Sequence, residues 1–108
     1  MLTLNKSNIF GEIPKKLKEE LFEDIISKEG LKIERIVSYG HTTPKSEWYE
    51  QGHDEWVILL KGEAIVSFFD EEDIKLKAGD YLNILALKKH RVSWTLPKQE
   101  SVWLAVHY

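Results

Sequence analysis

The first candidates for chemistry in this 108-residue chain are its four histidines, His41, His53, His90 and His107. No two of them have the close helical spacing of a zinc protease, and no Ser or Cys stands in a nucleophile elbow. The chain also has no glycine-rich loop that would cradle a phosphate. Any active site must therefore be assembled from segments that meet in space.

Residue parity indicates which side chains share a face, because alternate residues of a β-strand point to the same side. A regular strand over residues 49–59 puts one alternating set on an inner face: Tyr49, Gln51, His53, Glu55, Val57 and Leu59. On a later strand, His90 shares a face with the apolar residues Val92 and Trp94. An inward carboxylate and an inward imidazole suit Zn, Fe, Mn or Ni. The alternative is that both groups are hydrogen-bonded inside a metal-free interior.

The remaining polar candidates each have two interpretations. His107, next to the last residue, either lines the interior or makes a contact at the rim or with another subunit. Lys89 and Arg91 flank His90 and either meet an anionic substrate or face solvent. His41 stands before a Thr-Thr-Pro sequence, which is typical of a loop.

The segment 14–28 predicts one amphipathic α-helix that acts as a packing lid. Its apolar residues are spaced as one helical stripe: Leu17, Leu21, Phe22, Ile25 and Ile26. Pro14 suits the first helical turn, and Gly30 suits a left-handed stop beyond the last one. We therefore expect a helical N-terminal extension over residues 1–30.

Beyond Gly30 the hydrophobic period changes from 3.6 to 2, which indicates strands. After a first alternating segment that closes at Gly40, strand-like runs recur at about 46–51, 55–61, 63–69, 73–77, 81–86, 90–96 and 101–107. About eight strands without intervening helices predict an all-β sandwich or closed barrel. The length of 108 residues fits a single domain over 1–108, with its barrel at 31–107.

Composition excludes several classes of function. A net charge of −3 and a pI near 5.8 leave no basic footprint for nucleic acid or an anionic membrane. The absence of cysteine excludes disulfides and thiolate chemistry. The first residues lack the pattern of a signal peptide, and the longest apolar run, 56–60, is too short to cross a bilayer. We expect a soluble, cytoplasmic protein, and the apolar character of both faces of 56–60 predicts a homodimer.

Two stretches resemble the conserved motifs of the cupin superfamily. In the first, Glu55 and the turn residue Gly62 are separated by six residues. In the second, a Gly79–Asp80 turn precedes a strand and then His90, the position of a metal-ligating histidine in that family. The resemblance covers residues 31–107 and implies a jelly-roll β-barrel with a ligand site inside.

The first motif departs from the family pattern. Tyr49 and Gln51 stand where cupins usually supply two histidines, so only Glu55 and His90 remain of a set of three His and one Glu. The resemblance then implies a divalent metal, Zn, Fe, Mn or Ni, held by Glu55 and His90 with His53 and Gln51 as further ligands, and Tyr49 as a proton donor. Without a metal, His90 or Glu55 would act as general base or acid.

These considerations predict a small-molecule-binding cupin with its chemistry in the barrel cavity. One form is a divalent-metal-dependent enzyme in which Glu55, His90 and Tyr49 are the catalytic residues. The other is a non-catalytic ligand-binding or sensing domain without metal, which the loss of two imidazoles favours. A third possibility, a purely structural dimer, predicts an interior filled by large apolar side chains.

Overall fold

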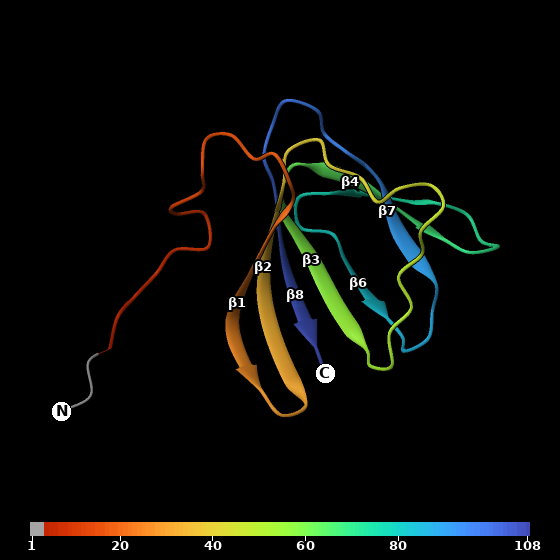
Figure 1. The fold of residues 1–108 in the computed structure, drawn as a ribbon, viewed down its shortest axis with the longest axis horizontal. Helices are drawn as coiled ribbons and strands as arrows, with labels where there is room; N and C mark the ends of the chain where they lie inside the picture. Colours follow the sequence, from red (N-terminus) through yellow and green to blue (C-terminus); the bar gives the residue numbers. More distant parts are fainter. Residues whose placement is uncertain (1–3) are drawn as a thin grey trace.

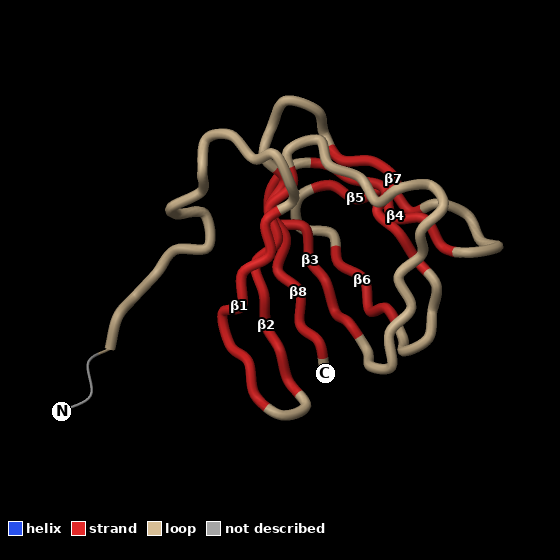
Figure 2. Tube along the Cα trace, viewed as in Figure 1, coloured by secondary structure: helices blue, strands red, loops and turns tan. Residues whose placement is uncertain are grey.

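The computed structural model describes residues 4–108 and contains eight β-strands in that range and no helix (Figures 1 and 2). The strands are β1 (Leu21–Lys28), β2 (Leu31–Ser38), β3 (Glu55–Lys61), β4 (Glu63–Phe68), β5 (Ile74–Lys77), β6 (Tyr81–Ile84), β7 (His90–Thr95) and β8 (Ser101–His107). The all-β prediction is confirmed, and six of the strands fall within the predicted runs from 55 onward.

The strands form two antiparallel sheets rather than one closed barrel, so the predicted closure is wrong. One sheet has the order β1-β2-β8-β3-β6, and the other has the order β5-β4-β7. The chain leaves β3 through a turn at Gly62, after which β4 pairs with β5 and β7 instead of continuing the first sheet. The predicted strand at 46–51 is a loop joined to β7 by a single bridge between Tyr49 and His90.

The predicted helix at 14–28 is also wrong, because residues 21–28 form β1, an edge strand hydrogen-bonded to β2. A bulge between Asp24 and Ile26 shifts the register, so the apolar residues lose the period of 2 that would have revealed a strand. Gly30 does have a left-handed φ of 75°, but it lies in the turn of the β1–β2 hairpin. Backbone hydrogen bonds to β2 along one edge of β1 outweigh the helical spacing of its apolar residues.

The hydrophobic core lies between the two sheets. It is formed by the inward residues of β3, β4, β5, β6 and β8: Val57, Leu59, Ala64, Val66, Leu76, Ile84, Trp103 and Ala105. The alternation on β3 places Glu55 on the same buried face as Val57 and Leu59. No helix within residues 4–108 is long and apolar enough to span a membrane.

Candidate functional site

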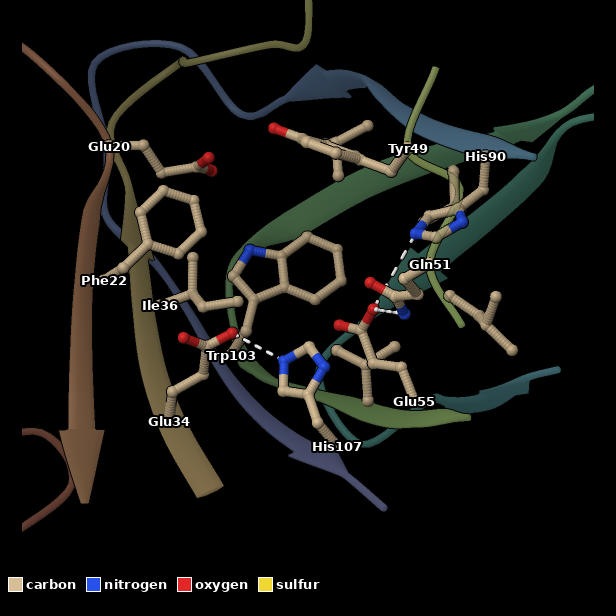
Figure 3. A pocket seen from close by; sticks show the side chains of 14 residues that line it. Glu20, Phe22, Glu34, Ile36, Tyr49, Gln51, Glu55, His90, Trp103 and His107 are labelled. Atoms are coloured by element: carbon tan, nitrogen blue, oxygen red, sulfur yellow. Dashed lines mark hydrogen bonds and ion pairs between the residues drawn. The ribbon is translucent and has the colours of Figure 1, made fainter. Parts of the chain in front are cut away.

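A cavity of about 180 Å³ opens between the sheets, and its walls combine apolar side chains with several polar ones (Figure 3). The polar lining residues are Glu20, Glu34, Tyr49, Gln51, Glu55, His90 and His107. They come from β2, β3, β7, β8 and the loops before β1 and β3. These polar side chains therefore meet only in the folded chain, as the sequence analysis predicted.

Glu55 and His90 face each other inside the cavity. The Nε2 atom of His90 lies 3.7 Å from Oε1 of Glu55, and the two residues are only 5% and 9% exposed, respectively. This separation is longer than a hydrogen bond, so a hydroxyl group between them can contact both. Gln51 donates a 2.9 Å hydrogen bond from Nε2 to the same Glu55 oxygen. The structure thus brings three of the predicted site residues together.

The hydrogen bond at the far side of the His90 ring defines its donor and acceptor atoms. Nδ1 lies 2.9 Å from the backbone oxygen of Lys88. A carbonyl oxygen only accepts, so Nδ1 carries the hydrogen and a neutral His90 presents the lone pair of Nε2 to the cavity. His90 is therefore oriented to accept a proton beside a carboxylate.

Tyr49 lies at the rim of the cavity, with 47% of its surface exposed. Its backbone exchanges hydrogen bonds of 2.7 and 3.0 Å with that of His90, and its ring lies 5.8 Å from the imidazole. The hydroxyl group points away from His90 and toward Glu20 (Figure 3). Tyr49 thus places its ring beside the imidazole of His90 and directs its hydroxyl to the opposite side.

His53 does not join this group. Its Nε2 atom lies 2.9 Å from Nδ1 of His107, and Nε2 of His107 lies 2.7 Å from Oε1 of Glu34. A carboxylate only accepts, so His107 carries a hydrogen on Nε2, and its neutral form accepts from His53 through Nδ1. Because His53 is exposed and Glu34 is buried, the three groups form a hydrogen-bonded chain from the surface to the cavity wall.

The donor set does not fit a tightly held transition metal. Such sites use three or four ligands, whereas of the four predicted ligands only Glu55 and His90 direct ligand atoms at each other. Gln51 directs its amide nitrogen, a donor, at the carboxylate, and His53 is bonded to His107. Within residues 4–108 no group of three or more His, Asp and Glu side chains is arranged to hold a metal ion.

Two lining carboxylates, Glu20 and Glu34, were missed in the sequence. Glu20 falls within the predicted helix at 14–28 and outside its apolar stripe, but in the structure it lines the cavity and accepts a hydrogen bond from Ser38. Burial raises the pKa of the Glu20 carboxyl above its ordinary value. Glu34 shares strand parity with Ile36, and that parity is the signal that would have found it.

The two basic residues beside His90 lie outside the cavity. Nζ of Lys89 lies 5.3 Å from the centre of the Phe69 ring, and the Arg91 guanidinium lies 5.6 Å from that of Trp48. Arg91 also donates to the backbone oxygen of Thr43. Of the two interpretations given above, these contacts favour a position outside the cavity over contact with an anionic substrate.

Comparison with known protein families agrees with the resemblance that the two motifs carry. Residues 35–107 match the model of the family described as a cupin domain. The chain belongs to the cupin family. No curated protein gives a significant match to this cupin.

Several solved structures share the fold. A protein of Ralstonia eutropha JMP134, provisionally named a mannose-6-phosphate isomerase, is 36% identical, with a TM-score of 0.92 over 96% of this chain and 97% of that one. A cupin superfamily protein of Desulfitobacterium hafniense DCB-2 is 22% identical, with a TM-score of 0.73 over 88% and 82% of the two chains. A cupin of Methanocaldococcus jannaschii with a double-stranded β-helix fold is 20% identical, with a TM-score of 0.70 over 89% and 85%.

Proposed function

We propose that this cupin binds a small polar molecule in the cavity between its sheets and transfers a proton on it without a resident metal. The observation that carries the proposal is the Glu55–His90 pair. Both side chains are buried, they lie 3.7 Å apart, and each keeps lone pairs directed at the cavity. Buried titratable groups that converge in a pocket are typical of functional sites.

The chemistry that suits this pair is general acid–base catalysis. Nε2 of His90 accepts a proton from a hydroxyl or an activated C–H group, and Glu55 stabilises the imidazolium that forms. The proton then returns from His90 to another atom of the bound molecule, which restores the neutral ring. An isomerase works by such a transfer, and the provisional name of the Ralstonia protein at 36% identity supports this class.

The second candidate function is ligand binding without catalysis. It is favoured by the hydrogen bond from Gln51 to Glu55, because a carboxylate that accepts this bond has one oxygen already engaged. In this form Gln51, Glu55 and His90 recognise the bound molecule and no bond is broken. Turnover of the retained molecule, followed by NMR, distinguishes the two functions.

Native mass spectrometry combined with metal analysis of the untagged protein tests the proposal. We expect a small metabolite to remain bound and metal content to stay well below one equivalent. His90→Ala and Glu55→Gln should each lose the metabolite, whereas His41→Ala, in a loop that does not line the cavity, should retain it. One equivalent of metal that disappears with His90→Ala would contradict the metal-free proposal. Absence of any bound molecule would favour a structural role.

A further inference from the structure

The cavity is unusual in the sign of its charge. Three carboxylates line it, those of Glu20, Glu34 and Glu55, and among residues 4–108 no Lys or Arg does. The two lining imidazoles, of His90 and His107, each already face one of these carboxylates. The raised pKa of Glu20, caused first by burial and increased by Glu34, agrees with carboxylates gathered in one poorly solvated space.

An anionic ligand would find no cation in this space. Lys32 has its Nζ atom 3.7 Å from Oε2 of Glu34, but it does not line the cavity and its side chain is 42% exposed. Lys89 and Arg91 rest on aromatic rings outside. A phosphate or carboxylate group buried here would therefore lose its hydration and lie among three carboxylates without a Lys or Arg to pair with.

A second and independent observation concerns the donor that the cavity offers. Trp103 is only 3% exposed, and its Nε1 atom, which is buried, has no hydrogen-bond partner among residues 4–108. The indole nitrogen is on the side of the ring toward Glu20 (Figure 3). Buried polar groups normally have partners, so an unpaired donor in a cavity indicates a ligand atom that accepts.

The occupant must therefore both accept and donate. It must accept from Nε1 of Trp103 and donate to the carboxylates, and a hydroxyl group does both. The apolar and aromatic walls, with Phe22 and Tyr49 among them, suit the C–H faces of the same molecule. The volume of about 180 Å³ is below the range of roughly 300–1,000 Å³ typical of drug-sized ligands, so the molecule is small.

We propose that the cavity selects an uncharged, polyhydroxylated molecule of monosaccharide size and rejects its phosphorylated and carboxylated counterparts. This inference rests on the proposed function and specifies its substrate class. It separates this chain from what the provisional name of the Ralstonia protein would suggest, because that name specifies a sugar phosphate.

Isothermal titration calorimetry with matched pairs of sugars tests the inference. The panel is mannose, glucose, galactose and ribose, each beside its phosphate ester. We expect at least one uncharged sugar to bind and its phosphate to bind at least about tenfold more weakly, a difference equal to about 1.4 kcal/mol. Trp103→Phe should weaken binding of the uncharged sugar by about three- to tenfold, as expected for one lost hydrogen bond.

Two further variants make the test specific. Trp94→Phe changes a tryptophan of β7 that does not line the cavity, and it should leave the affinity unchanged. Glu20→Gln removes one charge at nearly constant shape, so it should narrow the difference between sugar and sugar phosphate. A parallel circular dichroism spectrum checks that each variant is folded.

The possible failures are distinguishable. A phosphate ester that binds as tightly as its parent sugar, with the affinity lost in Trp103→Phe, would overturn the charge selectivity and leave the proposed function intact. Failure of every uncharged sugar to bind would overturn the inference. The proposed function would then still be decided by the retained metabolite and its loss in His90→Ala.

Discussion

Gln51 donates a 2.9 Å hydrogen bond to Glu55 at the point where the cupin motif usually places an imidazole. An imidazole at that position would offer a lone pair to a metal beside the carboxylate, whereas the amide nitrogen offers a hydrogen to the carboxylate itself. The substitution of Gln for His therefore replaces a coordinating contact by an internal one. A two-residue change should reverse it.

The double variant Tyr49→His and Gln51→His should gain a metal site. It adds two imidazoles at the rim and wall of the cavity next to Glu55 and His90, which completes a set of four ligands. Inductively coupled plasma mass spectrometry after incubation with Mn²⁺, Ni²⁺ or Zn²⁺ should show about one equivalent in the variant and little in the parent protein. Stoichiometric metal in the parent protein would contradict our account of Gln51. Adding His90→Ala to the double variant should abolish the binding.

Parity predicted the Glu55–His90 pair because the pairing register is unbroken from Glu55 to Leu59 and over residues 90–92, where both residues stand next to inward apolar residues. It misplaced His53, since the loop before β3 is irregular and the alternation does not extend back through Gly52. It missed Glu20 because the bulge in β1 gave the neighbouring apolar residues a helical spacing. The alternation of apolar and polar residues predicts a strand only over stretches in which the pairing register is unbroken.

The closed barrel was predicted wrongly because sequence patterns do not contain the pairing of strands in space. Strand count and turn spacing are properties of the sequence, whereas the pairing of β4 with β5 and β7 depends on which edges meet in space. The unpaired Nε1 of Trp103 is equally invisible in a sequence, because parity assigns a face to a tryptophan but no partner to its nitrogen.

Glu20 should make stability depend on pH in a defined direction. Burial, and to a smaller extent Glu34, raises the pKa of its carboxyl above the ordinary 4.5, against the lowering effects of the Ser38 hydrogen bond and His41. Between the ordinary and the raised pKa, the folded state keeps a proton that the unfolded state has lost, so stability falls as pH rises through that window.

Glu20→Gln removes this dependence and keeps an acceptor for Ser38. Urea unfolding should show the variant more stable than the parent protein at about pH 7 and the two converging below about pH 4. A stability difference that shrinks with rising pH would contradict this.

Gly62 should tolerate no side chain. It has a φ of 93°, and a Cβ atom at this position would lie 2.2 Å from Oγ and 2.8 Å from Cα of Ser101. Gly62→Ala should lower the free energy of unfolding by about 2–5 kcal/mol, the sum of backbone strain and overpacking.

Gly79→Ala is the control, because Gly79 has a φ of 96° but no atom within 4 Å of such a Cβ. It should therefore show only the backbone share of the loss, about 1–2 kcal/mol, in the same urea titration. Equal losses in the two variants would argue against the contact with Ser101.

The outer face of the five-stranded sheet supports the expectation of a homodimer. Trp56 and Ile58 on β3 point away from the core, and their cross-strand neighbours on β8, Val106 and Leu104, extend the apolar surface. The helix predicted at 14–28 as a packing lid is absent from residues 4–108, so it does not cover this face. Light scattering should therefore give about twice the chain mass of 12.6 kDa at micromolar concentration.

Ile58→Lys should produce monomers because it places a charge in the shared surface. Ile65→Lys, at a half-buried position of the other sheet, should leave the dimer intact. A monomeric parent protein would mean that this face is stable in water without a second copy.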